Sequence, residues 1–86
     1  MKWDEVRRKY PNSGVLVEAL CASSKENKRI ITEMMVLKES DSAHVLWKSY
    51  KEIHLKYPNK ELYIFHTSKK QIEVEEQPFH HIYKKT

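Results

Sequence analysis

The chain has 86 residues, 40% of them hydrophobic and 33% charged, and we expect a single domain over residues 1–86. No apolar run approaches the ~20 residues that cross a bilayer, and the charged residues after Met1 do not resemble a secretory signal. The single cysteine, Cys21, excludes an internal disulfide and a cysteine-based zinc site, which favours a reducing, cytoplasmic setting. The net charge of +4 is compatible with weak attraction to nucleic acid, although both signs alternate along the chain.

The first half of the chain predicts a short helix followed by a hairpin. Over residues 2–10, Trp3, Val6 and Tyr10 have the spacing of one helical face, and Pro11-Asn12 ends the helix. Apolar runs at 15–22 and 28–38 predict two strands, and the polar residues 24–27 predict the turn between them.

The second half predicts a long helix and two more strands. Ser40-Asp41-Ser42 supplies N-cap chemistry for a helix that runs to Tyr57 and ends at Pro58-Asn59. Residues 62–67, which are mostly apolar, predict a central strand, and the alternation at 72–75 predicts an edge strand. Pro78 begins a tail over residues 78–86, expected to be flexible or to pack on a partner or an open sheet face through its apolar residues, Phe79, Ile82 and Tyr83.

These elements predict an α+β fold with the order α-β-β-α-β-β. The long helix lets the third strand return antiparallel beside the first, giving a mostly antiparallel four-stranded sheet in the order 2-1-3-4. The expected domain has two layers, with the long helix on one face of the sheet and a short N-terminal helix.

The sequence repeats Lys-Tyr-Pro-Asn at residues 9–12 and 56–59. At the same offset Trp3 matches Tyr50 and Val6 matches Ile53. Two interpretations stay open: a tandem helix–strand–strand unit, or a tetrapeptide that simply suits the end of a helix and the start of a strand.

The expected hairpin register divides the sheet into two faces. One face, with Val15, Val17, Met34 and Val36, is suited to lie under the long helix. The other face is too apolar for an ordinary wet surface and predicts an interface with a second copy or another protein, made of Leu16, Glu18, Leu20, Ile31, Glu33, Met35 and Leu37.

In that register Glu18 lies opposite Glu33, a pairing that destabilises a sheet unless both carboxylates are solvated or find a cation. An ordinary solvated face is therefore an alternative to the interface. A metal or catalytic pair with His66 is the weakest interpretation, because acid–base chemistry also needs a cleft around a substrate. We expect no enzymatic activity, no metal and no cofactor; with Gly14 as its one glycine, the chain has no phosphate-binding loop.

An alternative function is weak binding of nucleic acid or another anion. Basic residues near both ends of the chain would supply the charge, with Tyr10 and Tyr83 as stacking groups. The main candidates are Arg7, Arg8, Lys69 and Lys70, supplemented by Lys9, Lys84 and Lys85.

Several stretches resemble a group of small uncharacterised bacterial proteins. They are Trp3-x-x-Val6, Tyr10-Pro11-Asn12 before the run Val15–Leu20, and Glu61–Ile64 leading into His66-Thr67-Ser68. The resemblance covers most of the first 75 residues and leaves out the tail. It implies a bacterial, cytoplasmic protein and carries over no functional site.

Overall fold

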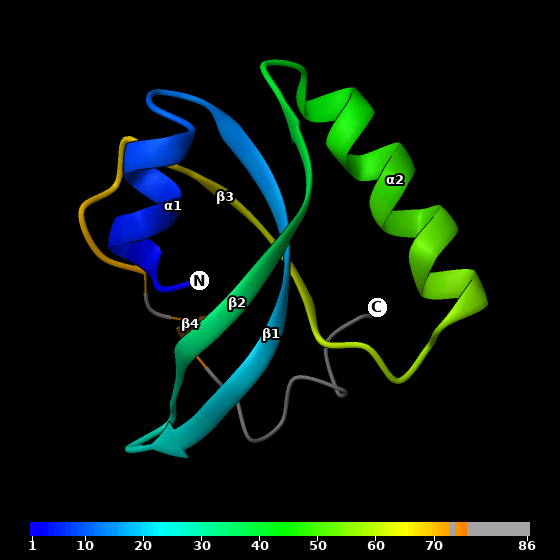
Figure 1. Ribbon diagram of the computed structural model, residues 1–86. Helices are drawn as coiled ribbons and strands as arrows, with labels where there is room; N and C mark the ends of the chain where they lie inside the picture. The colour runs from blue at the N-terminus through cyan, green and yellow to red at the C-terminus, as the bar shows by residue number, and fades with distance from the viewer. Residues whose placement is uncertain (73, 76–86) are drawn as a thin grey trace.

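Figure 1 shows the computed structural model, which describes residues 1–72 and 74–75. The predicted tail at 78–86 lies outside these residues. The elements in chain order are α1 (Trp3–Lys9), β1 (Gly14–Lys25), β2 (Lys28–Ser40), α2 (Ala43–Lys56), β3 (Leu62–His66) and β4 (Val74–Glu75).

The protein is α+β, but the predicted two-layer domain with a four-stranded sheet in the order 2-1-3-4 is wrong. The sheet proper is three-stranded and antiparallel, in the order β2-β1-β3. The two-residue β4 pairs only with Lys28 and Arg29 at the start of β2, on the edge of the sheet opposite β3. The loop after β3 crosses to this edge of β2 because it is held against α1: the Trp3 Nε1–H donates to the Lys69 carbonyl at 2.9 Å.

The two helices cover opposite faces of the sheet (Figure 1). On one face, Trp3 and Val6 of α1 pack with Val15, Val17 and Met34. On the other face, Leu46 of α2 packs with Leu16 and Leu62. The expectation that the long helix covers the Val15 and Val17 face is therefore wrong: the short helix covers it, and the long helix takes the other.

The repeated Lys-Tyr-Pro-Asn marks two equivalent helix–strand units. Tyr10 and Tyr57 end their helices with nearly the same backbone angles, φ −126° and ψ 69° against φ −133° and ψ 72°. Val6 and Ile53, which match in sequence, accept the N–H of these tyrosines and lie in the two apolar clusters. The equivalence ends there, because β2 pairs with β1 whereas β4 does not pair with β3.

The hairpin has a tighter turn than the sequence predicts. Lys25 pairs with Lys28, so only Glu26 and Asn27 form the loop, with φ of 53° and 66°. Two positive φ angles are the signature of the type I′ turn, which matches the twist of the flanking strands. With this turn and the irregularities along the ladder, Glu18 lies opposite Met35 rather than Glu33.

The hairpin turn yields a stability prediction. Glu26 is held in the left-handed region, which asparagine tolerates better than glutamate. We expect Glu26→Asn to raise the free energy of unfolding by about 0.5–1 kcal/mol, measured by urea denaturation. Glu26→Gln removes the same charge without relieving the backbone, so an equal gain in that variant would contradict the explanation.

A second prediction concerns Gly14, where β1 meets both β2 and α2. A Cβ at this position would lie 2.8 Å from the Ser40 carbonyl oxygen and 2.8 Å from Leu46 Cδ1. Because a backbone atom cannot move aside as a flexible side chain can, Gly14→Ala should cost about 1–3 kcal/mol of unfolding free energy. The exposed Ser23→Ala on the same strand is the control, and an equally small effect at Gly14 would contradict the packing argument.

Candidate functional site

The structure separates the residues of the predicted apolar interface. Leu16 is fully buried beneath α2, and Leu37 packs against the same cluster. Ile31 packs on the α1 side of the sheet. Two apolar members remain well exposed, Leu20 at 55% and Met35 at 44%. The surface left for a partner on this face is therefore much smaller than the sequence indicates.

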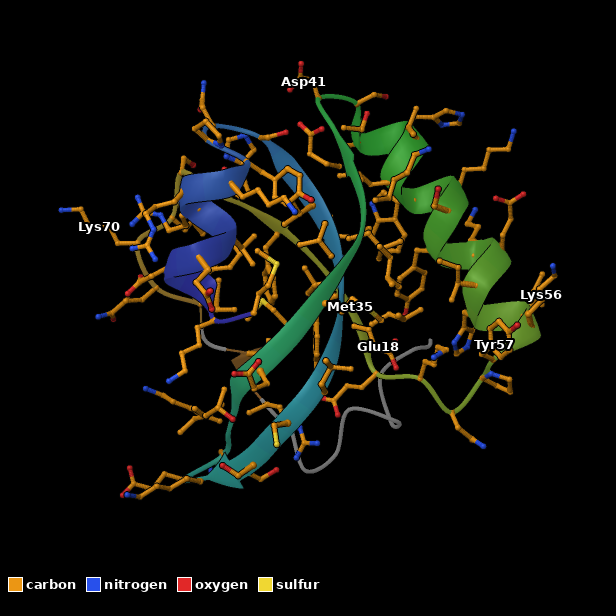
Figure 2. All side chains as sticks on the ribbon, in the orientation of Figure 1. Glu18, Met35, Asp41, Lys56, Tyr57 and Lys70 are labelled. Carbon is orange, nitrogen blue, oxygen red and sulfur yellow. The ribbon has the colours of Figure 1, made fainter. Side chains whose placement is uncertain are left out.

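The two predicted interface carboxylates have separate partners. Glu18 lies beside Met35 on the side of the sheet that faces α2 (Figure 2) and accepts from Lys60 Nζ at 3.1 Å. Glu33 accepts from the amino group of Met1 at 3.0 Å. They do not form a carboxylate pair, and no cluster of three metal-ligating side chains occurs within residues 1–72 and 74–75. The geometry thus gives the metal or catalytic interpretation no support.

His66 takes part in a local turn. Its Nδ1 accepts the backbone N–H of Ser68 at 3.2 Å and lies 2.8 Å from the Ser68 hydroxyl oxygen. Both side chains are exposed, and both contacts span only two residues. These bonds fit the structural interpretation of a histidine whose neighbours close a turn.

A charged network that the sequence did not predict joins β2 to the start of β3. Arg29 donates to both carboxylate oxygens of Glu61, at 2.7 and 2.8 Å, and the Tyr63 hydroxyl donates to the same carboxylate at 2.6 Å. The hydrogen bonds from Arg29 lower the pKa of Glu61. Burial and the neighbouring carboxylate raise the pKa of Tyr63 to about 12. The network stabilises the sheet at the end where β3 begins.

The lowered pKa of Glu61 gives a pH prediction. A carboxylate whose pKa is lower in the folded state stabilises the fold above its unfolded pKa, and this contribution is lost as the pH falls through the folded value. We expect Glu61→Gln to reduce the free energy of unfolding at neutral pH and the difference from wild type to shrink in acid. A difference that stays constant from neutral pH into acid, followed by urea denaturation, would contradict it.

The outer edge of β3 is open within the part of the chain that the structure describes, since β3 pairs there only with β1. The Thr67 N–H donates to Ser13, and the Glu61 carbonyl accepts from Ala19, both at 2.8 Å. Along a strand, the main-chain N–H and C=O groups of successive residues point alternately to one neighbour and to the other side. The odd-numbered residues of β3 therefore bond to β1. The main-chain groups that point outward are those of Leu62, Ile64 and His66.

An aromatic row on α2 borders this edge. Trp47 and Tyr50 make an edge-to-face contact with centroids 5.2 Å apart, and Tyr50 stacks on His54 at 5.9 Å. Ala43, one turn before Trp47 on the same flank, lines a hollow of about 290 Å³ together with Ile64 and His66 of β3. The flank therefore faces β3, and Trp47 is 52% exposed on it.

The predicted anion-binding residues, by contrast, are brought together. The Arg7 Nε–H donates to the Thr67 carbonyl at 2.9 Å, and Thr67 Oγ1 accepts from Ser13 and donates to the Tyr10 carbonyl. These bonds hold the loop after β3 against α1. We call the resulting group the basic corner, formed by Arg7, Arg8, Lys69 and Lys70. The supplementary Lys84, Lys85 and Tyr83 lie outside the described residues.

No family model, no curated protein and no solved structure matches the chain. The resemblance to small bacterial proteins therefore stays a prediction. Within the described ranges, no helix has the length and apolar character needed to cross a membrane.

Proposed function

We propose that the protein is a non-enzymatic interaction module that forms a homodimer by pairing β3 with β3 of a second copy. The observation that carries this proposal is the outward row of main-chain donors and acceptors on Leu62, Ile64 and His66. An open strand edge of this kind is a template for another strand. The proposed contact replaces the larger sheet face indicated by the sequence.

The register of such a dimer follows from the outward groups. A two-fold axis at Ile64 places Ile64 opposite its own copy and Leu62 opposite His66 of the second copy. All three residues then use outward main-chain groups, although the His66 carbonyl already accepts from Lys69 N–H at 3.2 Å. No two like charges face each other, because β3 carries no Lys, Arg, Asp or Glu. The strand is thus complementary to itself.

The aromatic row on α2 supplies the apolar part of the proposed contact. Neighbouring strands lie ~4.8 Å apart, so the β1 strands of the two copies, three spacings apart, are separated by ~14 Å. Since α2 packs on all three long strands, the two α2 helices would lie side by side at about that spacing. An α-helix with its side chains is ~10 Å wide, so at this spacing the facing flanks are close enough for the exposed Trp47 side chains of the two copies to meet.

The single cysteine and the absence of a membrane-spanning helix among the described residues support a cytoplasmic setting, which we include in the proposal.

The proposed dimer is tested by measuring the molecular mass of the protein in solution. We expect sedimentation velocity to show a dimer for the wild type and a monomer for Trp47→Glu, because the substitution removes apolar contact and places two carboxylates near the two-fold axis. Leu55→Glu is the matched control: Leu55 is 83% exposed and lies on the solvent-facing side of the same helix, about two turns beyond Trp47. A monomeric wild type at the highest soluble concentration, or equal loss of the dimer in both variants, would refute the proposal.

Amide exchange of the wild type and Trp47→Glu locates the contact. In the dimer the amides of Leu62, Ile64 and His66 should be protected, and in the monomeric variant they should exchange fast while those of Tyr63 and Phe65 stay protected by β1. Protection of the outward amides in a monomeric protein would mean that another segment of the same chain covers the edge, which also refutes the proposal.

A further inference from the structure

We propose that the basic corner is a binding site for the phosphate backbone of a nucleic acid, a function separate from dimerisation. The corner exists only in the folded chain, since its two pairs of cations are about sixty residues apart in sequence. The contacts from Trp3 and Arg7 to the loop after β3, each 2.9 Å, hold Lys69 and Lys70 beside α1. Figure 2 shows Lys70 projecting outward on that side of the molecule.

The charges of the basic corner are not neutralised within residues 1–72 and 74–75. Arg8, Lys69 and Lys70 are exposed, and none of the four cations forms an ion pair with a described carboxylate. Arg7 uses its Nε–H to hold the loop, which leaves its terminal nitrogens for a ligand. Two carboxylates offset part of this charge: Asp4 lies with Arg7 and Arg8 around a shallow hollow of about 330 Å³, and Glu5 is close enough to Arg8 to interact electrostatically with it. Positive charge dominates the corner.

An extended polyanion suits these cations better than a small enclosed anion. The cations come from a helix and a loop and line an open surface, so they can contact successive phosphates along a strand. Of the exposed large apolar side chains among the described residues, Ile30, 39% exposed, lines a hollow with Lys70, and this single side chain is much less than the apolar patch that inserts into a lipid surface. Trp3 is only 8% exposed, and the half-buried ring of Tyr10, the expected stacking group, already has Lys9 Nζ over it at 5.6 Å from the centroid. The binding therefore depends on the phosphate backbone rather than on sequence.

The test is fluorescence anisotropy with labelled single-stranded and duplex DNA oligonucleotides over a range of salt concentrations. The wild type should bind at low ionic strength, and its affinity should fall steeply with added salt. The double variant Arg8→Gln/Lys70→Gln keeps Arg7 and the fastened loop. It should bind roughly tenfold more weakly at low salt, with a log–log salt slope smaller by about 2, because each missing cation leaves one phosphate with its counterion.

The matched control is Lys48→Gln/Lys51→Gln, which removes the same charge from exposed positions on α2. It should leave affinity and salt slope close to wild type. Asp4→Asn should strengthen binding, a gain that unfolding cannot produce. The proposal is overturned if neither oligonucleotide binds, if the control weakens binding as much as the corner variant, or if Asp4→Asn brings no gain. Tighter binding to anionic lipid vesicles than to DNA would also overturn it.

Discussion

The structure depends on the complete burial of three successive residues at the start of β1. Val15, Leu16 and Val17 each have 0% exposure. Successive side chains of a strand point to opposite faces, so burying all three requires a cover on both sides of the sheet. The short α1 covers Val15 and Val17, and the long α2 covers Leu16. Gly14, immediately before this run, allows the close approach of β2 and α2.

The helices α1 and α2, which bury the two faces of the sheet, pack on it in the same way. In each unit a helix ends at Tyr-Pro-Asn and packs on alternate residues of the strand that follows. Val15 and Val17 face α1, whereas Leu62 and Ile64, which occupy the matching positions in sequence, lie in the cluster under α2. Because β1 and β3 are antiparallel neighbours with matching positions on opposite faces, the two helices come to lie on opposite sides of the sheet. The repeated tetrapeptide therefore has an architectural meaning.

The proposed surfaces both follow from how the chain leaves β3. The contacts of Trp3 and Arg7 with the loop after β3 send the chain across α1 to the far edge of β2. The same contacts gather four cations in the basic corner and leave the outer edge of β3 open among the described residues. Dimerisation and polyanion binding would use neighbouring parts of the molecule: the β3 edge with the Trp47 flank in one case, and the basic corner beside α1 in the other. Lys69 lies between them, since it also lines the hollow between α2 and β3.

The sequence by itself determined the local elements, because their signals are short-range. Helical spacing at Trp3, Val6 and Tyr10, the Ser42 cap and the breaks at Pro11 and Pro58 place both helices and three long strands close to their observed bounds. It also supplied the four cations of the basic corner. The tertiary structure decided the rest. A two-residue shift in the hairpin register separated Glu18 from Glu33, and a pair of contacts about sixty residues apart in sequence moved β4 away from β3, which turned an expected central strand into an edge. Such choices depend on side-chain packing between distant segments, and no local pattern records them.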